Sequence, residues 1–251
     1  MATVPASLDD APSADPLRGL LSSLPPEDQL RSGMRIGYRE FLRRREAVRP
    51  ALERQGRSAT IERIGGTVRI MFPADYEFHA MPQGDLIFLF VLYRSRTPGV
   101  ISAGPGTLDI DDLGVTVEPD ASLAISPEHG GQLRRDDDGR IAGVPELVVE
   151  IANTSEAYDL GAKREAYEAA GVREYLVHAV RSKRFHAFRR EGAALAAVSL
   201  DDGVFVSRAF PGLRIDCDAL LGGELAEAIA TLEAGCGTKA HREFIDRLET
   251  R

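Results

Sequence analysis

The sequence contains only two cysteines, no tryptophan and no long hydrophobic run. Cys217 and Cys236 lack the spacing of a metal-binding motif, and a single pair gives no disulfide framework, as is typical of a reducing compartment. The longest apolar run, Leu86 to Tyr93, is too short to cross a bilayer. The first residues lack the basic and apolar regions of a secretion signal. We therefore expect a cytoplasmic protein without a membrane segment.

An excess of positive charge is also missing. The chain has 31 Lys and Arg against 39 Asp and Glu, a net charge of −8 and a pI of about 5.3. Bulk charge therefore does not favour polyanions, although a local basic surface can still bind them. The stretch Arg35 to Glu53 has a helical pattern and begins an arginine series: Arg39, Arg43, Arg44, Arg45, Arg49 and Arg54. These arginines are either a solvated helix face or contacts to phosphate.

The chain divides into a tail and one domain. Residues 1–30 are rich in proline and have no apolar period, which predicts a flexible N-terminal tail. No linker divides residues 31–251. Alternating segments predict hairpins at 59–71 and 107–118, and helical spacing predicts C-terminal helices from about residue 222. A helix over Leu86 to Tyr93, capped by Asp85, is apolar nearly all round and is therefore expected to be buried.

The segment from Gly143 to Leu176 organises the rest of the chain. Glu146 to Ile151 is short and apolar, as in a buried strand. Side chains alternate along a strand, so Glu146 and Glu150 lie on one face and the neighbouring apolar residues on the other. A carboxylate within such a strand is costly unless it is paired or binds a metal. Glu150 is therefore the first candidate for a functional residue.

A helix follows this strand and ends at Gly171. Asp159, Lys163 and Tyr167 recur every four residues, so they lie on one helix face. An acid at the strand end and a lysine on the next helix can face one pocket. The alternative is an exposed ion pair between Asp159 and Lys163.

Asp120 is a second acid at a strand, because it follows Pro119 and precedes an apolar segment. The strands of Asp120 and Glu150 can lie side by side. Neighbouring carboxylates repel each other unless a cation separates them. Mg²⁺ prefers oxygen ligands and needs only one or two carboxylates, and a nearby Lys163 can stabilise anionic charge. His79 and Glu62 stand apart from this set: His79 is more typical of a structural histidine, and Glu62 of a solvent-facing strand residue.

These segments resemble the PD-(D/E)XK nuclease superfamily, most closely its uncharacterised, restriction-endonuclease-like bacterial branch. That branch typically has an ELIDGE hairpin, a QPD strand, a PDLVVEVLSPS strand, a D-x-G-x-K-x-x-x-Y helix and an AGVPEYW segment. The corresponding segments here are ERIGG from Glu62, EPD at 118–120, PELVVEIANTS at 145–155, DLGAK at 159–163 with Tyr167, AGVREYL at 170–176 and PGL at 211–213. The match covers about residues 36–221, and 143–176 is its most specific part.

The resemblance implies an α/β fold with a mixed central sheet flanked by helices. It implies that Asp120 and Glu150 bind Mg²⁺, for which Mn²⁺ can substitute. Lys163 would be the motif lysine, moved onto the helix, and Glu62 would lie at the edge of the site. The implied substrate is DNA, and the implied assembly is a homo-oligomer, most simply a dimer.

The chain departs from the family pattern around this core. Ala152 occupies the third motif position, Gly65-Gly66-Thr67 replaces the acidic hairpin turn, Asn153-Thr154-Ser155 replaces SPS, and His178 replaces an acid. Three functions remain open on these grounds. The first is a Mg²⁺-dependent endonuclease. The second is a nuclease-fold protein that binds nucleic acid or self-assembles without efficient cleavage, and the third is another metal-dependent hydrolase on the same scaffold.

Overall fold

The structure is a computed structural model, and it describes residues 24–54, 59–71, 76–135 and 141–250. Most of the predicted tail, residues 1–23, lies outside the described residues. The remainder belongs to the folded part: η1 (Pro26–Asp28) is a short 3-10 helix, and Leu30 is completely buried. Leu30 packs with Phe41 and Ile61 in a small hydrophobic cluster. Burial of this leucine places the start of the folded chain before residue 30.

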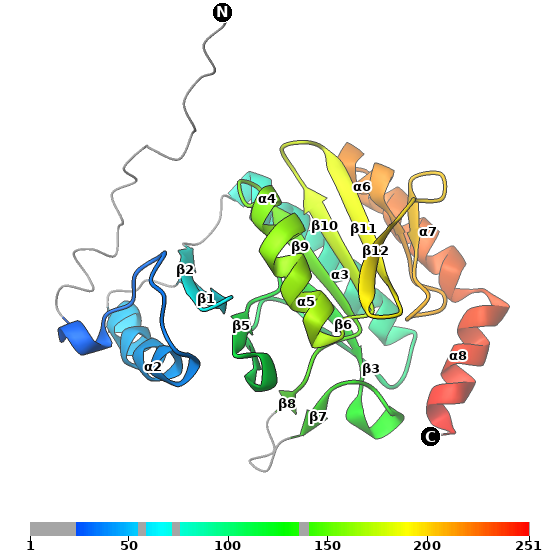
Figure 1. Cartoon of the computed structure of the whole chain (residues 1–251). Helices are drawn as coiled ribbons and strands as arrows, with labels where there is room; N and C mark the ends of the chain where they lie inside the picture. The colour runs from blue at the N-terminus through cyan, green and yellow to red at the C-terminus, as the bar shows by residue number, and fades with distance from the viewer. Residues whose placement is uncertain (1–23, 55–58, 72–75, 136–140, 251) are drawn as a thin grey trace, which may run out of the picture.

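A mixed six-stranded sheet forms the centre of the molecule, in the order β12-β11-β10-β9-β6-β3 (Figure 1). Its strands are β3 (Val100–Ala103), β6 (Ala121–Ile125), β9 (Leu147–Ala152), β10 (Glu174–Ala179), β11 (Arg184–Glu191) and β12 (Ala194–Val198). β9 and β10 are parallel, whereas the other neighbours are antiparallel. The predicted α/β class with a mixed sheet is confirmed, and so is the expected pairing of the strand after Asp120 with the strand of Glu150.

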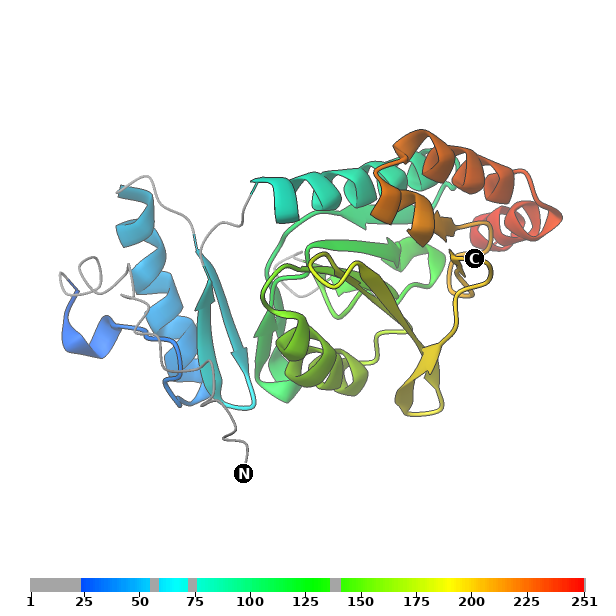
Figure 2. The same cartoon turned by 90° about the horizontal axis from the view of Figure 1, so that it is seen from above.

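Helices cover both faces of this sheet (Figure 2). One face carries α3 (Met81–Ser95), α6 (Cys217–Gly222), α7 (Leu225–Cys236) and α8 (Lys239–Glu249). The opposite face carries α4 (Glu156–Tyr158), the π-helical turn η5 (Asp159–Lys163) and α5 (Arg164–Ala170). Along β9, Leu147 and Val149 join the core beneath α3, whereas Val148 joins the core beneath α5. The predicted alternation therefore holds, and it directs Glu150 towards η5 and α5.

A smaller four-stranded sheet, in the order β2-β1-β5-β4, lies beside the central one. It consists of the two predicted hairpins, β1 (Thr60–Ile64) with β2 (Thr67–Met71) and β4 (Leu108–Ile110) with β5 (Val115–Val117). The 3-10 turn η3 (Asp111–Leu113) connects the second pair. Helix α2 (Tyr38–Arg54) packs on β1 through Phe41, Val48 and Leu52. This sheet brings Glu62 of β1 close to the end of β5.

Several elements differ from the sequence expectations. Strand β3 and the π-helical turn η2 (Tyr76–Ala80) lie in segments without a clear period, and α6 precedes the predicted C-terminal helices. Residues 126–142, for which the sequence predicted no helix or strand, contain η4 (Pro127–His129), β7 (Arg134–Arg135) and β8 (Ile141–Ala142). β13 (Val204–Val206) and β14 (Arg214–Asp216) pair only with each other among the described strands. Helix α3 begins at Met81 and is not buried all round, because Phe88 and Val91 are exposed.

Candidate active site

Glu150 and Lys163 form the centre of the site. Glu150 lies on β9 and is 2% exposed. Its Oε2 accepts a hydrogen bond from Lys163 Nζ at 2.8 Å, and its Oε1 accepts one from the Tyr167 hydroxyl at 2.7 Å. Tyr167 follows Lys163 by one helical turn, so a single helix face supplies both donors. Each oxygen of the buried strand carboxylate therefore accepts one hydrogen bond from this helix.

Lys163 lies in the helical segment after β9, which contains the π-helical turn η5. This segment ends at Gly171, as predicted. Ser155 occupies the first position before α4, but its hydroxyl donates to Asp159 Oδ2 at 2.6 Å instead of capping a backbone amide. π-helical turns are rare and often occur at functional sites. Gly171 follows α5 with a φ of 96°, which favours glycine. Asp159 lies 3.9 Å from Lys163, but both residues are buried, so the alternative of an exposed ion pair is wrong.

Glu62 approaches the same lysine from the smaller sheet. Its carboxylate is completely buried, and its Oε1 lies 3.0 Å from Lys163 Nζ. The same oxygen accepts a hydrogen bond from the Glu118 amide at 2.9 Å, and Oε2 accepts one from the Tyr158 hydroxyl at 3.1 Å. The interpretation of Glu62 as a solvent-facing residue is therefore wrong. Glu62 contacts Lys163 from the side opposite the pocket and fixes the position of its ammonium.

Asp120 lies directly before β6 and is held by three donors. Its Oδ2 accepts a hydrogen bond from the Ile151 amide of β9 at 2.7 Å. Its Oδ1 accepts one from Gln83 Nε2 at 3.1 Å and lies 3.0 Å from His79 Nε2. The Gln83 amide also reaches the Asp120 carbonyl oxygen at 3.1 Å. Asp120 is therefore fixed by the neighbouring strand on one side and by η2 and α3 on the other.

These residues meet in one pocket of about 780 Å³. Its charged and polar walls are formed by Thr60, Arg69, His79, Gln83, Glu118, Asp120, Glu150, Asn153, Thr154, Ser155, Asp159 and Lys163. Among the predicted site residues, Asp120, Glu150 and Lys163 line the pocket, whereas Glu62 lies behind it. Arg69 brings positive charge to the wall, and its guanidinium stacks 3.9 Å above the Tyr158 ring.

Burial and neighbouring charges shift the pKa values of Glu150, Asp159 and Lys163 in this pocket. Burial raises the pKa of Glu150 well above its usual range, and the nearby Lys163 ammonium only partly opposes this. Burial also raises the pKa of the Asp159 carboxyl. Burial would lower the pKa of Lys163, but Glu150 and the other surrounding carboxylates outweigh it and raise that pKa well above its usual range. The charged form of Lys163 is therefore favoured, because the carboxyl groups of Glu150, Glu62, Asp159 and Asp120 surround its ammonium.

This donor set fits a small divalent cation. Asp120 and Glu150 present carboxylate oxygens to one pocket, and hard cations such as Mg²⁺ select oxygen ligands. The described residues contain no group of three or more His, Cys, Asp or Glu side chains arranged to hold a metal. A cation at this place would therefore be held by two protein carboxylates and complete its shell from water or substrate, as Mg²⁺ commonly does.

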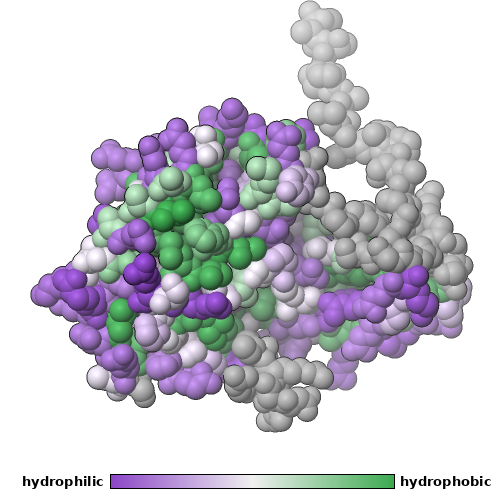
Figure 3. Space-filling view, turned by 180° about the vertical axis from the view of Figure 1, so that it is seen from behind, coloured by the Kyte–Doolittle hydropathy of each residue, from purple (hydrophilic) through white to green (hydrophobic). Residues whose placement is uncertain are grey.

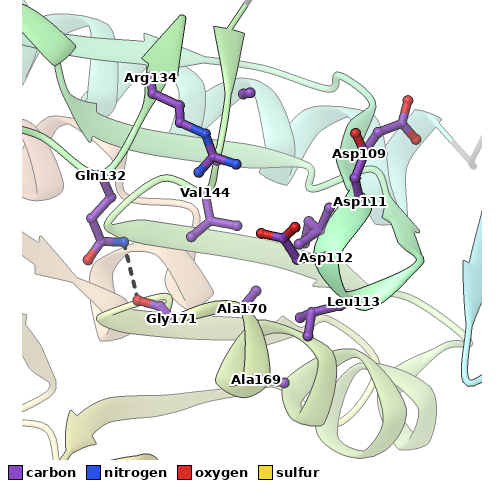
Figure 4. Close-up of a pocket in the computed structure, with 13 residues that line it drawn as sticks. Asp109, Asp111, Asp112, Leu113, Gln132, Arg134, Val144, Ala169, Ala170 and Gly171 are labelled. Atoms are coloured by element: carbon purple, nitrogen blue, oxygen red, sulfur yellow. Dashed lines mark hydrogen bonds between the residues drawn. The ribbon is translucent and has the colours of Figure 1, made fainter. Parts of the chain in front are cut away.

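The acidic turn at 111–112 forms part of a different pocket (Figure 4). Asp109 accepts hydrogen bonds from Arg45, and Asp111 accepts one from the Tyr38 hydroxyl. Asp112 and Arg134 lie on the walls of this pocket, whose volume is about 410 Å³. These hydrogen bonds connect Asp109 and Asp111 to helix α2.

The arginines of α2 are largely engaged within the chain. Arg43 pairs with Glu40 and Asp28, and Arg44 pairs with Glu40. Arg45 is buried and forms two hydrogen bonds of 2.7 Å with Asp109. These contacts favour a structural role for this helix, so the basic residue to consider at the pocket is Arg69. The sequence alone did not place His79 and Gln83 at the candidate site, because neither lies in a segment with a recognisable period.

Comparisons with known proteins identify one matching family and a similar solved structure. The model of a family described as "Uma2: Putative restriction endonuclease" matches residues 45–218. A crystal structure described as "a putative nuclease belonging to DUF820 from Anabaena variabilis ATCC 29413" is similar, with a TM-score of 0.50 and 12% identity. The similarity covers 78% of this chain and 99% of that one, and it shows a shared fold. No curated protein matches the chain. The predicted resemblance to restriction-endonuclease-like nucleases is confirmed.

Proposed function

The chain belongs to the Uma2 family, and from this we propose that it is a metal-dependent endonuclease that hydrolyses phosphodiester bonds in DNA. The observation that carries the proposal is the meeting of Asp120, Glu150 and Lys163 in one pocket. Two carboxylates can hold a cation that activates water, and one charged lysine can stabilise the negative charge that develops on the phosphate. The two free cysteines, Cys217 and Cys236, fit a cytoplasmic setting.

Asp120 and Glu150 would hold Mg²⁺, or Mn²⁺ in its place. When bound, the ion would supply positive charge for the phosphate and promote deprotonation of the attacking water. Lys163 remains charged in the pocket wall, where its ammonium can stabilise negative charge that develops on the phosphate. Glu62 keeps Lys163 in this position without lining the pocket. Arg69 contributes a second positive charge that can contact a phosphate of the DNA backbone.

The testing experiment is single-turnover nicking of supercoiled plasmid DNA by the full chain, with Mg²⁺, with Mn²⁺ and with excess chelator. The parent should cut only when metal is present. Glu150→Gln should lose this cleavage, because it removes a carboxylate from the pocket. Asp112→Asn is the matched control, because it removes an exposed acid that lines the other pocket, and it should cut like the parent.

Two results would contradict the proposal. If the parent binds DNA but never cuts it with either metal, the chain is a nucleic-acid-binding member of its family. If Glu150→Gln and Asp112→Asn cut equally well, cleavage does not take place at this pocket.

A further inference from the structure

Helix α3 exposes an apolar stripe on the face turned away from the core. Five of the seven large apolar side chains that are exposed among the described residues lie on η2 and α3: Tyr76, Phe78, Met81, Phe88 and Val91. The opposite face of α3 buries Leu86, Leu89, Phe90 and Tyr93. Figure 3 views the molecule from the α3 side and shows a hydrophobic patch in the middle of that face. Contiguous exposed apolar patches on soluble proteins mark interaction sites.

The spacing of the stripe indicates that its partner is another helix. The exposed positions of α3 are Met81, Gly84, Phe88, Val91, Arg94 and Ser95, and five of them, all except Arg94, alternate steps of three and four residues. This is the spacing of the seam between two paired helices. The bulky residues Phe88 and Val91 are in the middle, and small residues, Gly84 and Ser95, flank them. Small residues at the flanks let two helices approach closely around a central apolar contact.

The charges along α3 select one orientation for such a pair. Asp85 lies near the N-terminal end and Arg94 near the C-terminal end, and neither makes an ion pair with another described residue. Two α3 helices side by side in the same direction would bring like charges together. In the antiparallel orientation, the acidic end of each helix lies alongside the basic end of the other. The pattern is therefore complementary to itself, as a two-fold symmetric interface requires.

We propose that α3 is the dimerisation helix of this protein, and that it packs antiparallel against α3 of a second copy. Phe88 of each copy packs on the partner's Val91, and each Gly84 lies opposite the partner's Ser95. Tyr76 and Phe78 of η2 extend the contact beyond the helix. Neither a membrane nor a nucleic acid fits this stripe as well, because both favour several Lys or Arg around the apolar residues, whereas α3 contains a single basic residue, Arg94.

Two measurements test the proposal on the full chain. Sedimentation equilibrium between roughly 1 and 100 µM should show a dimer for the parent. Phe88→Asp should weaken dimerisation by on the order of 100-fold or more, because it places a charge in the centre of the interface twice. Val206→Asp is the matched control, since Val206 is also an exposed apolar residue but lies on β13, and this variant should dimerise like the parent. Circular dichroism should show that both variants stay folded.

Cysteine cross-linking tests the orientation. A helix rises about 1.5 Å per residue, so in the proposed pair the two copies of residue 91 lie about 5 Å apart along the axis, whereas the two copies of residue 81 lie about 25 Å apart. Val91→Cys should therefore form a covalent dimer on mild oxidation, whereas Met81→Cys and the parent should not. A monomeric parent at 100 µM, an unchanged Phe88→Asp dimer, or efficient cross-linking of Met81→Cys would each overturn the proposal.

Discussion

Lys163 Nζ lies 2.8 Å from Glu150 Oε2, and this contact joins the π-helical turn η5 to strand β9 of the central sheet. Glu62 of the smaller sheet lies 3.0 Å from the same ammonium. One buried side chain therefore connects both sheets and the helix that covers them. Its loss should affect both the stability of the fold and the chemistry of the pocket, and the two effects can be measured separately.

Replacing Lys163 by methionine should destabilise the protein by roughly 3–5 kcal/mol, because it leaves Glu62 and Glu150 buried without their counterion. An exposed lysine would cost far less. Urea unfolding of parent and variant measures this difference. Under conditions in which the variant is folded, plasmid cleavage should fall by on the order of 10²–10³, whereas Mn²⁺ binding should persist because lysine is not a ligand.

The double variant Lys163→Met with Glu62→Gln separates these two roles. It removes one of the unpaired carboxylates, so it should be more stable than Lys163→Met alone but equally inactive. Cleavage at the parent rate by either variant would show that Lys163 has no part in the reaction.

Metal binding should depend on Asp120 and Glu150. Asp120→Asn and Glu150→Gln should each weaken Mn²⁺ binding measured by calorimetry, because each replaces a charged oxygen ligand with a neutral amide. Glu165→Gln, on the exposed side of α5, should bind Mn²⁺ like the parent. If both pocket variants bind Mn²⁺ like the parent, the cation is held elsewhere.

His79 should position Asp120 for that role. His79→Ala should weaken Mn²⁺ binding by roughly 10–100-fold although both carboxylates remain, because hydrogen-bond partners of ligands orient them. His186→Ala is the control, since His186 contacts Glu156 rather than a residue proposed to bind metal. Equal affinities for these two variants would reduce His79 to a structural residue, and this outcome leaves the assignment of Asp120 untouched.

Contacts with DNA phosphates should come from Arg69 and Arg181. Arg69 lines the pocket, and Arg181 donates to Asn153, which also lines it. Arg69→Gln and Arg181→Gln should each lower the slope of log affinity against log salt concentration by about 0.9, since each removes one phosphate contact. Arg43→Gln should leave the slope unchanged, because Arg43 is paired with Asp28 and Glu40. If Arg43→Gln lowers the slope and Arg69→Gln and Arg181→Gln do not, the DNA contacts lie on α2 instead.

The arrangement at the centre of the candidate site could be predicted from the sequence, because it depends on local patterns. The apolar strand, its alternation and the four-residue spacing of Asp159, Lys163 and Tyr167 determine which face each side chain takes. Glu150 and Lys163 then meet only if the helix packs on the face of the strand that carries Glu150, and this packing is present in the structure. The strand of Asp120 follows for the same reason, because it is short, apolar and adjacent to β9.

The remaining site residues depend on contacts that local patterns do not contain. Glu62 alternates within its hairpin as a solvent-facing residue would, and its burial arises only because β1 meets β5 and the pocket. His79 lies in the π-helical turn η2, which has no periodic signature. The apolar run in α3 predicted burial on every side, yet one face has no cover among the described residues. Periodicity identifies an element and its faces, but it does not identify the partner of each face.

His178 provides a test that is independent of catalysis. It lies on β10, is 5% exposed and stacks on Phe185, and its Nδ1 has no hydrogen-bond partner among the described residues. Burial lowers its pKa from 6.5 to about 4. The folded state therefore binds a proton less readily than the unfolded state, so this residue reduces stability as the pH falls from 6.5 to about 4. Between pH 7 and pH 5 the free energy of unfolding should fall by about 2 kcal/mol because of this residue.

His178→Phe keeps an aromatic ring beside Phe185 but cannot be protonated. Urea unfolding at pH 7 and pH 5 should therefore show a smaller loss of stability for the variant than for the parent, by that amount. Equal losses in parent and variant would mean that the folded protein accepts a proton on His178 without cost, as a solvated imidazole would.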